Sequence, residues 1–177
     1  MTSSAVWNIL VQRCRDHGPG TWDRDLNRDI HIASLPPEAE ARRSTRDRYY
    51  VSRYIYSDGT CSPLITAQAP DVSHEIDSAI RMIKQFLPGW WWSTGACHVS
   101  DDARIAPDFS DPKHRERLHA EIGEFDKNSP WNEGFDVDRR PPGNPAIALC
   151  EAYCMAQEAL AKRAERKVRA DAVSEDK

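Results

Sequence analysis

IDSAIRMIKQFLPGWWWSTGACHV, residues 76–99, is the stretch that decides the fold. Its first part repeats apolar residues at helical spacing, and the resulting stripe consists of Ile76, Ala79, Ile80, Ile83 and Leu87. Pro88 and Gly89 then end the helix, because neither residue continues a helix easily. The pattern predicts an amphipathic helix that leads directly onto a sheet.

The second part of the stretch, residues 90–99, is typical of a strand with an interruption near Gly95. Alternate side chains of a strand point to opposite faces, so Trp90 and Trp92 share one face and Trp91 lies on the other. Both faces cannot be free surface, and we expect at least one of them in the core. ARIAP, residues 103–107, is expected to pair with this strand as a hairpin.

A second hairpin is predicted upstream. YYVSRYIY, residues 49–56, is rich in aromatic and β-branched residues, and the Asp-Gly turn at residues 57–60 leads to a returning strand at 61–66. Helices are expected at residues 5–15 and 22–34, and a long one begins at Asn144 and Pro145. The predicted fold class is α+β, with an antiparallel sheet built from hairpins and packed by helices in an α/β/α-type sandwich.

The length of 177 residues suits a single α+β domain, for which we expect residues 1–165. Residues 166–177 are expected to form a charged, frayed tail. Three polar stretches carry weaker patterns. We interpret residues 38–48 as an exposed linker or a frayed helical turn, residues 108–135 as a surface insertion that starts with a helix, and residues 138–145 as a loop.

Charge and composition exclude several classes of function. A net charge of −4 argues against broad nucleic-acid binding, which needs a basic surface. No apolar run approaches the roughly 20 residues that cross a bilayer, and residues 1–10 lack the order of a secretory signal. Five cysteines, an odd number, predict reduced thiols in a cytoplasmic protein.

Four stretches together resemble a family of small proteins from bacteriophages and prophages, the phage ABA-sandwich type. They are VQRCRDHGPGTWDRDLNRDIHIA (11–33), TAQAPDVSHEIDSAIRMIKQFLPGWWW (66–92), CHVSDDARIAP (97–107) and PGNPAIALCEAYCMAQEAL (142–160). The chain departs from the family pattern by insertions near residues 36–63 and 111–135. The resemblance implies a phage or prophage origin and cytoplasmic localisation in the bacterial host. It carries over no catalytic residues.

Catalytic and metal-binding motifs are missing from the sequence. Cys150 and Cys154 lie on one helix face, but no second pair accompanies them, so we interpret both as core residues. No cofactor or metal is predicted. One enzymatic alternative stays open, a hydrolase with a dispersed site formed by His98 and the Asp101–Asp102 pair.

Aromatic and arginine side chains suggest a ligand-binding site. If one sheet face is open, these rings and guanidinium groups can stack on and pair with a nucleotide or a partner loop, and the candidates are Arg48, Tyr50, Arg53, Tyr54, Trp91 and Arg104. The simpler alternative is a helix-covered sheet with tyrosine hydroxyls at its rim.

The leading functional hypothesis is a non-enzymatic phage or prophage accessory protein that binds a host or phage protein, in counter-defence for example. Alternatives are a decoy that sequesters a nucleotide-type immune signal, the hydrolase, and, least favoured, a nucleic-acid module built on residues 41–54. Two basic runs, at residues 41–48 and 162–169, contact phosphates or an acidic partner in one interpretation and are merely solvated in the other. Homo-oligomerisation stays open.

Overall fold

The computed structural model describes residues 2–18, 23–36, 38–43, 49–57, 59–123, 131 and 134–175. Within these residues the predicted α+β class is confirmed, and every strand pairing is antiparallel. The helices are α1 (Ser4–Asp16), α2 (Arg24–Ser34), α3 (Ile76–Phe86), α4 (Pro112–Ile122) and α6 (Pro145–Glu175). The strands are β1 (Ala39–Arg43), β2 (Tyr49–Tyr54), β3 (Ile65–Gln68), β4 (Trp90–Ala96), β5 (Asp101–Pro107) and β6 (Phe135–Arg139).

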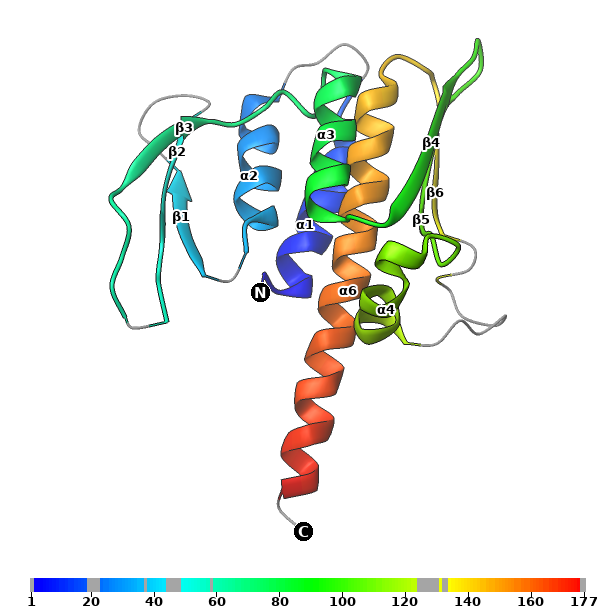
Figure 1. The fold of residues 1–177 in the computed structure, drawn as a ribbon. Coiled ribbons are helices and arrows are strands. Elements are labelled where there is room, and N and C mark those ends of the chain that lie inside the picture. Colours follow the sequence, from blue (N-terminus) through cyan, green and yellow to red (C-terminus); the bar gives the residue numbers. More distant parts are fainter. Residues whose placement is uncertain are drawn as a thin grey trace.

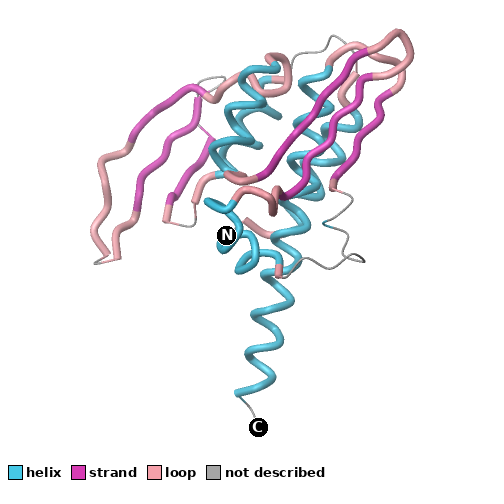
Figure 2. The backbone as a smooth tube through the Cα atoms, turned by 45° about the vertical axis from the view of Figure 1, so that its right-hand side comes forward, coloured by secondary structure: helices cyan, strands magenta, loops and turns pink. Residues whose placement is uncertain are grey.

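The strands form two separate sheets where the sequence suggested one. The N-terminal sheet has the order β1-β2-β3 and the C-terminal sheet the order β4-β5-β6. Figures 1 and 2 show the helices between the two sheets. The two sheets differ in their packing: the C-terminal sheet buries Trp90, Ala103, Ile105 and Val137 in the main core, whereas the N-terminal sheet contacts mainly α2.

Helix α6 is the centre of the structure. Its first half is almost entirely buried, and it contacts α1, α3, α4 and all three strands of the C-terminal sheet. The predicted alternation of β4 is confirmed, and the structure decides which face is buried: Trp90 is 6% exposed and Trp92 packs against the core, whereas Trp91 points outward. Trp90 also stacks on Phe135 and meets Trp131 edge-on.

Two strands correct the sequence interpretation. Residues 39–43 were expected in a linker, but they form β1, whose register pairs Ala41 with Ser52. Residue 135 was assigned to a surface insertion and residues 138 and 139 to a loop, but residues 135–139 form β6 and complete the C-terminal sheet. Alanine, arginine and aspartate are weak strand formers, so the pairing with a neighbouring strand decides both elements.

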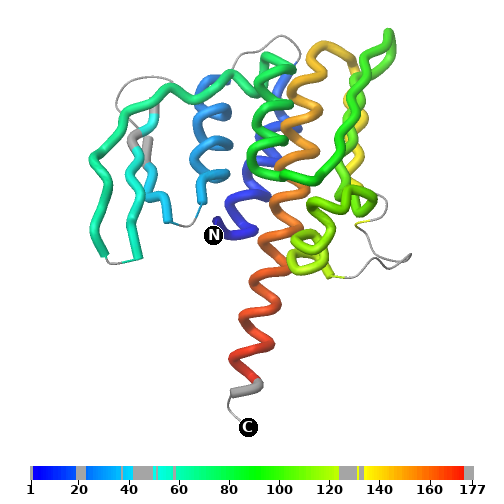
Figure 3. The backbone as a smooth tube through the Cα atoms, viewed as in Figure 1, coloured from blue at the N-terminus to red at the C-terminus, as the bar shows by residue number. Residues whose placement is uncertain are grey.

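The predicted start of the last helix is confirmed and its predicted end is corrected. Asn144 caps α6 by accepting a hydrogen bond from the amide of Ala146 at 3.0 Å, and Pro145 occupies the first helical position. Residues 166–175 continue the helix where a tail was expected. Figure 3 shows this last part of α6 projecting beyond the other elements. No helix among the described residues is long and apolar enough to span a bilayer.

Candidate functional site

Three of the six predicted ligand-binding residues lie on the N-terminal sheet. Tyr50 is half-buried and its hydroxyl lies 3.0 Å from Nε2 of His31 on α2. Burial raises the pKa of Tyr50, and the nearby Tyr54 adds to the effect. Arg53 forms an ion pair with Glu40 of β1, and Tyr54 is 43% exposed. Arg48 lies outside the described residues.

The other two lie on the outer face of the C-terminal sheet. The guanidinium carbon of Arg104 lies 5.5 Å from the centre of the Trp91 ring, and its Nε lies 3.3 Å from a carboxylate oxygen of Asp136. The helical layer separates the two sheets in Figure 2. The structure therefore does not bring the five described candidates together at one site.

The residues of the hydrolase alternative are also separated. Asp101 is 3% exposed and accepts hydrogen bonds from the backbone amides of Gly143 and Asn144 at 2.5 and 2.6 Å. Asp102 follows it in β5 and points to the exposed outer face, and His98 is exposed in the β4–β5 turn. The buried carboxylate therefore holds the start of α6, and the two aspartates do not act as a pair.

The interpretation of the helical cysteines as core residues is confirmed. Cys150 and Cys154 are fully buried beside Cys14, and the Cys150 thiol donates to the carbonyl of Val72 at 3.0 Å. Burial raises the pKa of both α6 thiols well above the ordinary value. Within the described ranges, no three His, Cys, Asp or Glu side chains are grouped to hold a metal ion.

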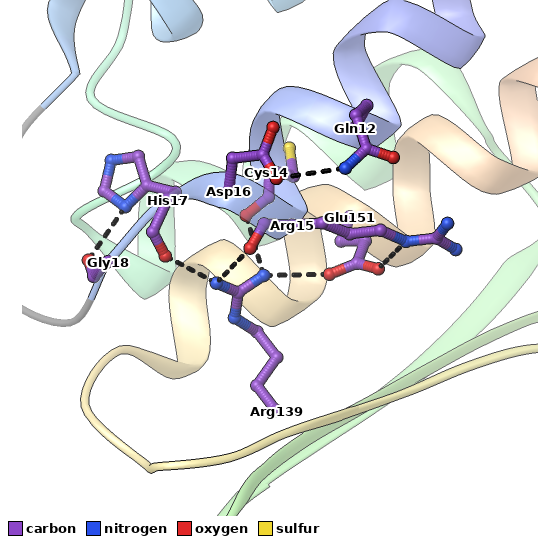
Figure 4. A network of polar contacts seen from close by, with 8 residues as sticks. All are labelled: Gln12, Cys14, Arg15, Asp16, His17, Gly18, Arg139 and Glu151. Atoms are coloured by element: carbon purple, nitrogen blue, oxygen red, sulfur yellow. Dashed lines mark hydrogen bonds and ion pairs between the residues drawn. The ribbon is translucent and has the colours of Figure 1, made fainter.

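A polar cavity of about 440 Å³ lies where the end of α1, β6 and the start of α6 meet. Arg139 lines this cavity and lies at the centre of the polar network drawn in Figure 4. Its guanidinium donates to the carbonyls of Cys14 and His17 at 2.7 and 2.6 Å and to the Glu151 carboxylate at 2.9 Å. Glu151 also accepts a 2.8 Å hydrogen bond from Arg15. These bonds hold the C-terminus of α1 against α6, so Arg139, Glu151 and Arg15 stabilise the packing of the two helices.

His17 lies in the same cavity and is 7% exposed. Burial lowers its pKa below the ordinary value of 6.5, and the positive charges of Arg139 and Arg13 act in the same direction. Its Nδ1 lies 3.2 Å from the carbonyl of Gly18, and this contact and the charge of Asp23 oppose the shift.

A larger cavity, of about 900 Å³, runs along the second half of α6. We call it the α6 groove and define it by two sets of residues. The apolar floor consists of Trp7, Phe86, Leu87, Trp131 and Leu160. The basic wall consists of Lys162, Arg163, Arg166 and Lys167.

The basic wall has two kinds of residues. Lys162 pairs with Glu158 at 2.6 Å, and Arg163 donates to the backbone carbonyl of Glu121 at 3.0 Å, which ties α4 to α6. Arg166 and Lys167 are exposed and form no ion pair with any residue that the structure describes. Glu121 is the single acidic residue among those that line the groove, which thus has four cationic groups and one carboxylate.

The sequence indicated the basic wall of this groove but not its apolar floor. The basic run at residues 162–169 was recognised, with an acidic partner as one of its two interpretations. The floor was missed because its side chains come from α1, α3, α6 and the region around Trp131. No local pattern links residues that far apart.

Comparison of the chain with protein-family models, with curated proteins and with solved structures finds no match. Its function is therefore inferred from its own surfaces and charges.

Proposed function

We propose that this chain is a non-enzymatic protein-binding module whose α6 groove takes an acidic, amphipathic segment of a partner protein. The observation that carries the proposal is the combination of a half-buried apolar floor with a row of cations on one helix. Helices with one apolar and one acidic face are a common ligand of such grooves.

The floor supplies the affinity. Phe86, Trp131 and Leu160 are only partly buried, so a bulky apolar side chain laid on them removes water from both surfaces. Full burial of one large apolar side chain is worth about 1.5–3 kcal/mol. Two or three such anchors offset much of the loss of rotational and translational freedom on binding, and contacts of the basic wall add to them.

The basic wall determines which partners bind. The chain as a whole carries a net charge of −4, yet the groove has an excess of cations. Such a local reversal attracts acidic segments and repels basic ones, and it acts mainly on association rate and specificity.

A peptide fits the groove better than a nucleic acid does. Single-stranded nucleic acids need open aromatic faces on which bases stack. Trp7 is 2% exposed and packs edge-on against Tyr153, and the partly buried rings of Phe86 and Trp131 meet His31 and Trp90 edge-on, so the floor offers no row of open aromatic faces. The nucleotide decoy and the hydrolase receive less support, because their candidate residues are divided between sheets or between strand faces.

The biological setting is the second part of the proposal. The resemblance to small phage and prophage proteins suggests an accessory role inside a bacterial host cell, with a host or phage protein as the partner. Counter-defence is one such role. A gene position within a prophage, beside other small early genes, would support this setting.

A peptide-display selection tests the groove directly. Immobilised chain is exposed to a library of random peptides, and in parallel the variant Arg166→Glu is used as bait. We expect peptides that combine acidic residues with aromatic or leucine residues to be enriched on the natural chain and lost on the variant. Arg169→Glu is the matched control, since Arg169 lies on the same helix but does not line the groove.

Fluorescence anisotropy with an enriched peptide then measures the affinity. We expect Arg166→Glu to weaken binding at least tenfold, which corresponds to about 1.4 kcal/mol, and Arg169→Glu to change it little. Equal enrichment on all three baits would refute the proposal. So would stronger binding of a single-stranded oligonucleotide than of any acidic peptide.

A further inference from the structure

The β2–β3 hairpin concentrates exposed apolar side chains. The described residues contain eleven large apolar side chains that are exposed, and five of them lie here: Tyr54, Ile55, Tyr56, Leu64 and Ile65. Leu64 is 60% and Ile65 52% exposed. Such clustering on a monomer marks an interaction surface, whereas single exposed apolar residues do not.

Strand β3 is also an open edge. It pairs with β2 on one side, and no strand among the described residues pairs with its other side. Edge strands are usually protected by charged residues, bulges or covering loops. Residues 59–70, GTCSPLITAQAP, contain no charged side chain, although 29% of the whole chain is charged. Pro63, which lies before the strand, is the one protective residue type within residues 59–68.

The N-terminal sheet is small and lightly supported. It has three strands, and its contacts with the rest of the described structure are made mainly by α2. The hairpin reaches past α2 in Figure 1. Small sheets gain stability from further strands and from a covered apolar face.

From these observations we infer that β3 pairs with β3 of a second copy of this chain, which gives a twofold dimer with one continuous six-stranded sheet. Antiparallel pairing of a strand with its own copy is isologous, so each backbone hydrogen bond across the interface is formed twice. The Ile65 side chains and their exposed neighbours are then brought together across the new interface.

A second copy is the occupant that the charge distribution favours. A charged edge would be repelled by its own copy, and a different partner is usually steered by complementary charge. The run at residues 59–70 carries no charge, so it neither repels its own copy nor attracts a different partner by complementary charge. It meets its own copy without repulsion, and homodimer interfaces are more apolar than other interfaces. This inference is independent of the α6 groove, which lies on other elements.

Sedimentation of the full chain tests the inference. Between about 1 and 200 μM we expect a monomer–dimer equilibrium, with a dissociation constant inside that micromolar range. Ile65→Lys places a charge on the edge and should weaken dimerisation at least tenfold. Ile9→Lys is the matched control because Ile9 is an isoleucine of similar exposure, 60%, on α1. It should leave the equilibrium unchanged.

Two further measurements keep the test decisive. Gln68→Lys changes an exposed side chain of β3, and it replaces Ile65→Lys if that variant fails to fold. Hydrogen exchange of the natural chain should show slower exchange of the residue 65–68 amides as the concentration rises. A strictly monomeric chain at the highest concentration would overturn the inference. A dimer that both β3 variants leave intact would also overturn it.

Discussion

The guanidinium of Arg139 and the carboxylate of Glu151 form a 2.9 Å ion pair beneath the C-terminus of α1. Both side chains are largely withdrawn from water, at 16% and 7% exposure. The same guanidinium also satisfies backbone carbonyls at the end of α1. One arginine of β6 therefore joins the first helix, the last helix and the C-terminal sheet.

The first prediction concerns this arginine. Arg139→Met removes the hydrogen bonds and leaves the Glu151 carboxylate with Arg15 as its remaining partner, so we expect a loss of about 3 kcal/mol in the free energy of unfolding. Urea denaturation measures it. Arg140→Met is the control, because Arg140 is 65% exposed and pairs with an exposed Asp138. It should cost less than about 0.5 kcal/mol. Equal losses of unfolding free energy in the two variants would contradict the role of Arg139 in joining α1 to α6.

Two neighbouring aspartates give the second prediction. Asp101→Asn removes the negative charge that holds the amides of Gly143 and Asn144, so we expect a loss of about 2 kcal/mol. Asp102→Asn, on the opposite face of β5, should change stability by less than about 0.5 kcal/mol. Thermal unfolding of both variants compares them. A large loss at Asp102 alone would show that the inward and outward faces have been assigned the wrong way round.

The third prediction is a fall in stability at acidic pH. Burial lowers the pKa of His31 below its ordinary value of 6.5, and His17 shifts in the same direction. The unfolded chain therefore takes up protons first as the pH falls. The contribution is fully present above pH 6.5 and is lost as the pH falls through that value toward the folded-state pKa. Each histidine contributes at most about 1.4 kcal/mol per pH unit.

Urea denaturation at several pH values between about 5 and 8 measures this loss. His31→Gln keeps a polar group beside the Tyr50 hydroxyl and cannot titrate, so it should flatten the dependence. An identical slope in the natural chain and in His31→Gln would show that His31 is not a source of the effect.

Thiol reactivity gives the fourth prediction. Cys61 and Cys97 are exposed, whereas Cys14, Cys150 and Cys154 are buried. An aromatic disulfide reagent should therefore modify two thiols of the folded chain rapidly and the other three only after unfolding. Backbone amides of Val99 and Ser100 donate to the Cys97 sulfur and lower its pKa. Cys97 should react first, and Cys97→Ser should remove the faster of the two rapid phases and leave the reaction of Cys61.

Local patterns of the sequence determined most of the helices and both hairpins. The apolar stripe of α3 and the Pro-Gly pair after it place one helix and the start of β4. Asn144 and Pro145 mark the first turn of α6, and the alternation in β4 separates Trp90 from Trp91. Each of these signals acts over a few residues, so no tertiary contact is needed to recognise it.

Tertiary structure decided the rest. Strands β1 and β6 form because a neighbouring strand supplies hydrogen bonds that their weak propensities do not predict. The division into two sheets and the floor of the α6 groove depend on residues far apart in the chain, and so does the separation of Tyr50 from Trp91. Local sequence sets backbone preference and side-chain alternation, but burial and strand pairing are properties of the whole packed chain. These properties decide which of the candidate side chains meet.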